Sequence, residues 1–131
     1  MLEPGFERIY RRGRRALKAA RRDTSTENLH ELRKRAKDLW HAAQILRLAA
    51  PKKMKRLARH AHRLSDVVGA DHDLAVLRAA ARERQETLAS GELALLDGLI
   101  GRRREQLRRK ALKRARRLYA RKPRDVGSVL A

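Results

Sequence analysis

Apolar residues recur three and four positions apart along most of this chain, which is the spacing of one face of an α-helix. The pattern is clearest between residues 29 and 43. Its apolar positions there are Leu29, Leu32, Ala36, Leu39 and Ala43. A second face lies about 140° away at roughly 100° per residue, and it carries His30, Arg33, Lys34, Lys37 and His41. The sequence therefore predicts a helix with one buried stripe and one positively charged stripe.

The same pattern predicts five helices in all. They are expected over about residues 6–22, 26–49, 51–68, 71–89 and 90–118, followed by a short last turn from Pro123 toward Leu130. Thr24 and Glu27 have the spacing of a capping box at the start of the second helix, with Ser25 or Thr26 as alternative caps. Pro51 is expected to end the second helix and to occupy the first turn of the third.

Glycines mark other expected features of these helices. Gly69 stands where a glycine commonly ends a helix, and Asp71 could then cap the fourth helix. Gly13 lies on an apolar face, which indicates either a close approach of another helix or a kink. Gly98 and Gly101 are the expected position of a bend in the fifth helix.

Composition supports an all-α fold. Hydrophobic residues make up 42% of the 131 positions, Ala and Leu dominate them, and aromatic residues make up only 3%. These are helix-forming residues, and strand-forming residues are few. We expect an antiparallel helical bundle of about four to five helices in one domain, residues 1–131, ending in a basic helix end and tail over residues 102–131.

The charge balance implies a polyanionic partner. Lys and Arg number 35 against 15 Asp and Glu, a formal net charge of +20. Such self-repulsion opposes compactness unless an anion relieves it. There is no cysteine, which excludes disulfides and thiolate metal sites. No apolar run approaches 18 residues and no signal-peptide core follows Met1, so we expect a soluble cytoplasmic protein without a membrane partner.

Three local motifs carry a resemblance to a known family. They are Leu29-His30-x-Leu32-Arg33-Lys34-x-x-Lys37-x-Leu39-Trp40, Leu64-x-x-x-x-Gly69-x-x-His72-Asp73-Leu74-x-x-Leu77, and Tyr10-Arg-Arg-Gly-Arg-Arg15. Together they resemble the CHAD family, the conserved histidine α-helical domain that binds inorganic polyphosphate. The resemblance covers about residues 6–80, and the basic C-terminal segment fits it only loosely.

The resemblance implies two pseudo-equivalent helical halves, each with its own histidine helix, around a shared basic channel. This chain has one such helix, and its length suits one half, the C-terminal one. Either the chain is a truncated domain or two copies associate to rebuild the full arrangement. A homodimer is the working hypothesis. Association with polyphosphate granules in the cytoplasm is a further expectation, and the biological purpose of binding stays open.

A polyphosphate chain carries about one negative charge per phosphate and has no bases, so a binder needs rigid rows of cations. Helical rows with neighbours about 5–6 Å apart provide them, and Arg adds bidentate contacts to phosphate oxygens. The centre of the expected site is His30, Arg33, Lys34 and Lys37. Further candidates are Arg11, Arg12, Arg15, Arg56, Arg59, Arg63 and His72.

Each candidate has a structural alternative. A basic row can be a solvated face, His30 can be a neutral histidine that fixes helix packing, and His72 can help to cap the fourth helix. His60 and His62 diverge by about 200° on a helix and make a poor metal pair. Trp40 borders the apolar stripe, which favours a core or interface role over a stacking platform.

Enzyme motifs are missing from the sequence. It has no glycine-rich phosphate loop, no G-x-S-x-G and no His-Glu-x-x-His. Asp71 and Asp73 could hold Mg²⁺, but two carboxylates beside a helix start more often cap it. Members of the resembled family are often joined to a triphosphate-processing domain, for which this chain has no strand set. We expect no catalytic residue, no metal and no cofactor.

The main rival function is sequence-independent binding of RNA or DNA. The net charge supports it equally well, because phosphate contacts do not depend on sequence. Against it, the chain has four aromatic residues, few for a single-strand binder that stacks bases, and no clear recognition-helix module. A peripheral membrane or ribosome-associated scaffold would use the same basic faces, but a membrane helix would show a bulky exposed apolar face.

Overall fold

The computed structural model describes residues 2–127 and contains helices as its regular structure. The helices are α1 (Leu2–Arg22), α2 (Thr26–Leu46), α3 (Pro51–Glu83), α4 (Glu92–Leu118) and α5 (Pro123–Gly127), with a 3₁₀ turn, η1 (Gln85–Thr87), between α3 and α4. The expected all-α helical bundle is confirmed. Leu130, where the last turn was expected to end, lies outside the described residues.

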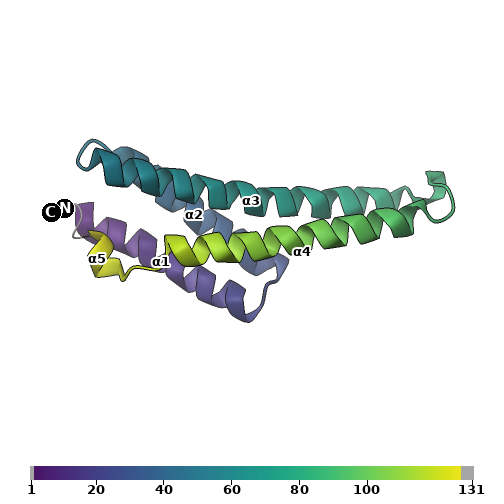
Figure 1. The fold of residues 1–131 in the computed structure, drawn as a ribbon, viewed down its shortest axis with the longest axis horizontal. Coiled ribbons are helices and arrows are strands. Elements are labelled where there is room, and N and C mark those ends of the chain that lie inside the picture. Colours follow the sequence, from purple (N-terminus) through teal and green to yellow (C-terminus); the bar gives the residue numbers. More distant parts are fainter. Residues whose placement is uncertain (1, 128–131) are drawn as a thin grey trace.

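Two long antiparallel helices, α3 and α4, lie side by side and form the long axis of the molecule (Figure 1). Helix α2 packs along α3, α1 packs on α2, and the short α5 folds back against α1. Both α3 and α4 continue beyond the loop that joins α1 to α2, as Figure 1 shows. We call residues 72–101 the hairpin and the rest of the described chain the body.

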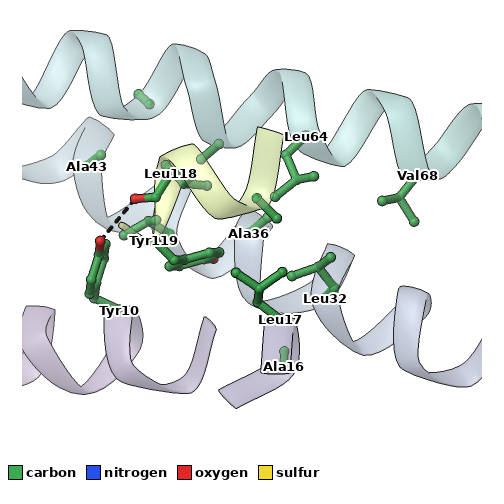
Figure 2. Close-up of a cluster of buried hydrophobic side chains, with 14 of the residues drawn as sticks. Tyr10, Ala16, Leu17, Leu32, Ala36, Ala43, Leu64, Val68, Leu118 and Tyr119 are labelled. Carbon is green, nitrogen blue, oxygen red and sulfur yellow. Dashed lines mark hydrogen bonds between the residues drawn. The ribbon is translucent and has the colours of Figure 1, made fainter. Parts of the chain in front are cut away.

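The core lies in the body, where α1, α2, α3 and the C-terminal half of α4 meet. The predicted apolar face of α2 is buried as expected, with Leu29 2% exposed and Leu32 and Leu39 fully buried. Figure 2 shows the part of this core around Tyr10, whose hydroxyl donates a hydrogen bond to the Leu118 carbonyl at 3.0 Å. Burial of this hydroxyl raises the pKa of Tyr10.

Close packing against α1 depends on Gly13. This glycine is buried, and the ring of Tyr119, just after α4, occupies the space that a Cβ would need. The same ring packs on Tyr10 with ring centroids 5.2 Å apart. Of the two alternatives for Gly13, close approach is therefore confirmed.

The predicted break after residue 68 is wrong. Helix α3 runs without interruption from Pro51 to Glu83, and Gly69 is buried inside it beneath the guanidinium of Arg33. Asp71 is not a cap, because its buried carboxylate accepts a hydrogen bond from Arg104 Nε at 2.9 Å. Glycine inside a helix costs about 1 kcal/mol. The packing of α2 and α4 against this part of α3 outweighs that cost.

His72 therefore occupies the interior of a helix and is exposed, so the expected capping role in a turn is also wrong. Other boundaries differ by a few residues. Helix α1 begins at Leu2, α2 ends at Leu46, and α4 begins at Glu92 after Gly91, whose φ is 85°. Helix α4 is one helix through Gly98 and Gly101.

The start of α2 settles the choice between the alternative caps. Ser25 is the N-cap, and its hydroxyl accepts a hydrogen bond from the Asn28 backbone N–H at 3.1 Å. The hydroxyl of Thr24 instead donates to the Ala20 carbonyl at 2.9 Å, which closes the end of α1. A side-chain acceptor at the N-cap satisfies one of the free N–H groups of the first turn.

Candidate polyanion-binding grooves

The C-terminal half of α4 is the element that brings the cations of this protein together. Ala111, Ala115 and Leu118 recur at helical spacing and are buried in the core. Lys113, Arg114, Arg116 and Arg117 lie between these buried positions, so basic side chains emerge on both sides of the buried stripe. Arg114 and Arg117, three residues apart, line one groove beside α4, and Arg116 lines another.

The first groove, which we call the α3–α4 groove, has a volume of about 400 Å³. Basic side chains come from both of its long walls and from the segment after α4: Lys53, Arg56 and His60 on α3, Arg114 and Arg117 on α4, and Arg121. Buried apolar residues, among them Met54 and Leu118, lie at its base. The apolar base belongs to the core, so the cations above it stand on a rigid support.

Electrostatics in the α3–α4 groove favour an anion. Burial, followed by repulsion from Arg59, Arg63, Arg114 and Arg56, lowers the pKa of His60 below its ordinary value. The Nε of Arg114 is shielded from solvent and has no hydrogen-bond partner among the described residues. The repulsion that adds to burial in lowering this pKa reflects the positive charge around His60, and a phosphate oxygen would be an acceptor for the unpaired Arg114 Nε.

The second groove, the α1–α4 groove, is larger and more open, about 940 Å³. Its cations are Arg11, Arg14, Arg15, Lys18, Arg21 and Arg22 on α1 and Arg116 on α4. Six of these seven belong to a single helix, so this groove has one basic wall. The α3–α4 groove, in contrast, presents cations on two facing helices.

A third groove, the α2–α3 groove of about 470 Å³, combines cations with aromatic rings. Its cations are Arg47, Lys55, Arg59 and Arg63. The half-buried Trp40 contacts two histidine rings, His41 with centroids 4.7 Å apart and His62 with centroids 4.6 Å apart. The Nδ1 of His62 also lies 3.3 Å from a carboxylate oxygen of Asp66.

The structure disperses the residues expected at the centre of the site. His30, Lys34 and Lys37 are exposed on the outer face of α2 and line none of these three grooves. Arg33 is half-buried, and its Nε donates to the Ser65 carbonyl of α3 at 3.2 Å. Arg33 therefore joins α2 to α3, and only part of its guanidinium is free for a ligand.

The two further rows are divided among the grooves. Arg11 and Arg15 line the α1–α4 groove, whereas Arg12 is exposed outside the three grooves. On α3, Arg56 lines the α3–α4 groove, and Arg59 and Arg63 line the α2–α3 groove. His72 is exposed in the hairpin.

Several groove cations were not among the candidates from sequence. They are Lys53, His60, Arg114, Arg117 and Arg121 in the α3–α4 groove, Arg14, Lys18, Arg21, Arg22 and Arg116 in the α1–α4 groove, and Arg47 and Lys55 in the α2–α3 groove. For Arg114, Arg116, Arg117 and Arg121 a signal was present, because Lys and Arg become dense after Arg102. Their spacing alone did not say which side of α4 would be covered by which helix.

The described residues contain no group of three or more His, Asp or Glu that could hold a metal ion. His60 lines the α3–α4 groove and His62 the α2–α3 groove, so these two histidines do diverge. Over the same part of the chain, none of the helices has the length and apolar character needed to span a membrane.

The fold and the grooves define a class of protein, namely small all-α proteins in which basic side chains from several helices line concave surfaces. More particularly, the chain belongs to the CHAD family, because the model of the CHAD domain matches residues 1–82. That family is linked in general to polyphosphate binding. No curated protein and no solved structure matched the chain. The match ends within α3, so α4 and its groove arginines lie beyond the matched residues.

Proposed function

We propose that this protein binds inorganic polyphosphate without catalysis, and that the α3–α4 groove is the centre of the binding site. The observation that carries the proposal is the convergence on one groove of five basic side chains from the facing helices α3 and α4, together with Arg121 after α4. Membership of a family linked to polyphosphate binding supports the choice of ligand.

The physical argument rests on preorganisation. A flexible polyphosphate chain loses conformational freedom when it is bound, so cations that are already held in place limit the total ordering cost. Met54 and Leu118 hold the walls of the α3–α4 groove to the core.

Charge-matched variants test the site. The groove variant carries Lys53→Ala, Arg56→Ala and Arg117→Ala, three exposed side chains that line the α3–α4 groove. The control variant carries Lys52→Ala, Lys110→Ala and Lys113→Ala, three exposed cations outside the three grooves. Both lose three charges. We expect the groove variant to bind polyphosphate about 10- to 100-fold more weakly at moderate salt and the control about threefold or less, since phosphate contacts are short-ranged.

Two further triple variants test whether another surface is the centre of the binding site. One removes Arg11, Arg15 and Arg116 from the α1–α4 groove, and the other removes His30, Lys34 and Lys37 from α2, all as changes to Ala. A loss larger in either triple than in the groove variant would move the centre of the site to that surface. Equal losses per formal charge removed in all four variants would mean that net charge alone attracts the ligand.

The α2–α3 groove favours a second candidate function, sequence-independent nucleic-acid binding. Trp40 lies in this groove together with four cations. Proteins that bind single-stranded nucleic acids combine aromatic rings, on which bases stack, with basic side chains that contact the backbone. Labelled polyphosphate should be displaced by RNA or duplex DNA only at large excess of phosphate. If RNA competes equally and Trp40→Leu weakens RNA binding alone, nucleic acid is the ligand.

A further inference from the structure

The hairpin differs in charge from the rest of the chain. It contains five carboxylates and three guanidiniums: Asp73, Glu83, Glu86, Glu92 and Asp97 against Arg78, Arg82 and Arg84. Its formal charge is therefore −2, which leaves +22 for the rest of the +20 chain. The hairpin is also the part of the molecule that projects beyond α1 and α2 (Figure 1).

Large apolar side chains are exposed on this projecting part. Val76 and Leu77 on α3 are 55% and 49% exposed, and Leu95 and Leu99 on α4 are 63% and 52% exposed. Leu95 and Leu99 are four residues apart and so share one face of α4. Such side chains on a projecting helical pair favour an apolar partner.

A second pair of exposed apolar side chains lies outside the hairpin and can be compared with Leu95 and Leu99. Ile45 and Leu48, at the connection between α2 and α3, are 70% and 90% exposed. Their neighbours in sequence include the exposed Arg47, Lys52 and Lys53. Two copies meeting there would bring cations together without nearby carboxylates in the sequence, whereas each hairpin carries carboxylates as well as guanidiniums.

We propose that the hairpin is the docking surface for a second copy of this chain, hairpin against hairpin, with the two basic bodies at opposite ends. Unlike the homodimer expected from the family resemblance, this dimer does not enclose a shared basic channel. The charge partition carries the choice of partner. Two bodies of +22 repel each other, so copies can approach most readily through the part whose charge is small and negative. Each hairpin also exposes both signs, since Glu83, Glu86, Glu92, Arg82 and Arg84 are all exposed, so that a twofold arrangement can bring opposite charges together.

The same reasoning disfavours a hairpin that docks on the body of another copy. That contact would satisfy charge but would leave Leu95 and Leu99 against a surface rich in cations. It would also be head-to-tail, and such contacts continue into open chains unless they close into a ring. The hairpin-to-hairpin contact stops at two copies and leaves the basic grooves open.

Sedimentation equilibrium of the full chain tests the proposal over about 1 to 200 µM protein. The expected species are one and two chains only. Leu95→Glu with Leu99→Glu should weaken dimerisation at least about tenfold, because the exposed side chains gain like charges at the contact. The matched control is Ile45→Glu with Leu48→Glu, which adds the same charges at the other exposed pair and should not weaken it.

Salt gives an independent readout. Screening reduces repulsion between the bodies, so added salt should strengthen the dimer, while it weakens binding of any polyanion in the grooves. The chain has no cysteine, so Leu95→Cys introduces a unique thiol. Oxidised Leu95→Cys protein should form a covalent dimer readily, and Leu48→Cys protein should not. A single-chain mass at every concentration, species larger than two chains, or equal loss in both Glu variants would overturn the proposal.

Discussion

The body and the hairpin share α3 and α4 but are held together differently. The body has a continuous buried apolar cluster drawn from α1, α2, α3 and α4. In residues 72–101, all of which the structure describes, Ile100 at the base is the only buried hydrophobic residue. Beyond it the two helices are linked by ion pairs, with Asp97 3.7 Å from Arg78 Nε and 3.5 Å from Arg82 Nη2.

This difference separates two tasks within one helical pair. The apolar body can carry a formal charge of +22 because its buried surface offsets the repulsion among the cations. The hairpin buries too little to add much stability of its own, and its small charge leaves it free to contact other surfaces. The basic grooves and the exposed apolar side chains of the hairpin therefore lie in different parts of the molecule.

The largest expected effect comes from Asp71, at the junction of the two regions. Its carboxylate is 4% exposed and lies within salt-bridge distance of Arg104 and Arg108. Asp71→Ala leaves both guanidiniums without their carboxylate and should lower the free energy of unfolding by about 3–5 kcal/mol. Urea denaturation measures it. The exposed Asp73→Ala is the control and should change stability by less than about 0.5 kcal/mol.

Hydrogen exchange should show that the hairpin opens more readily than the body. At low protein concentration, backbone amides of residues 76–96 should open locally and exchange at least about 100-fold faster than those of residues 32–43, a difference of ~2.7 kcal/mol in opening free energy. Mass spectrometry of peptides covering the two ranges measures the ratio. Equal protection would mean that the hairpin unfolds only together with the body, which would contradict a lower stability of the hairpin.

Two glycine substitutions should have opposite signs. Gly13→Ala places a methyl group against the Tyr119 ring in the body and should destabilise the protein by about 1–2 kcal/mol. Gly98→Ala meets nothing within 4 Å on the hairpin and should stabilise it by up to about 1 kcal/mol through helix propensity. Thermal unfolding of both variants gives the measurement. A loss of stability in Gly98→Ala would mean that the hairpin is more tightly packed than its exposure indicates.

The smallest expected effect is a pH dependence through His60. Its pKa lies below the ordinary value, so His60 is mainly neutral above pH 7 and gains charge only as pH falls. Burial is the main cause of the lowered pKa, and a bound polyanion offsets the second cause, the repulsion from the arginines. Binding therefore takes up a proton, and affinity should rise as pH falls from about 8 to about 5.5, by roughly two- to fivefold. His60→Gln should flatten that part of the profile. An identical profile in wild type and variant would place His60 outside the site.

The same depressed pKa bears on stability without ligand. A histidine whose folded pKa lies below its unfolded value binds protons better in the unfolded chain, so protonation favours unfolding. The free energy of unfolding should therefore fall as pH drops through the unfolded value near 6.5, and His60→Gln should reduce this fall. The wild-type profile minus the variant profile isolates His60 from the other four histidines.

Sequence alone determined the helical class and the inward faces of the helices. Residues 29–43 bury the apolar positions that their spacing predicts, because amphipathic periodicity is a local property of the chain. For Gly13, a small residue on an apolar face, the sequence left two alternatives, a close approach or a kink, and the structure shows the close approach. The matches to the CHAD motifs were local too, and the family assignment agrees with them.

Tertiary structure alone decided the length of α3 and the positions of the grooves. Gly69 and Asp71 have the local character of a helix end, but burial against Arg33 on α2 and pairing with Arg104 on α4 keep the helix continuous. Likewise, a row of cations on one helix says nothing of which neighbour will face it. His30, Lys34 and Lys37 form a row without a facing helix, whereas Lys53, Arg56 and Arg117 are gathered into one groove by the packing of α3 against α4. Contacts between residues far apart in sequence depend on how the helices pack, which no local pattern contains.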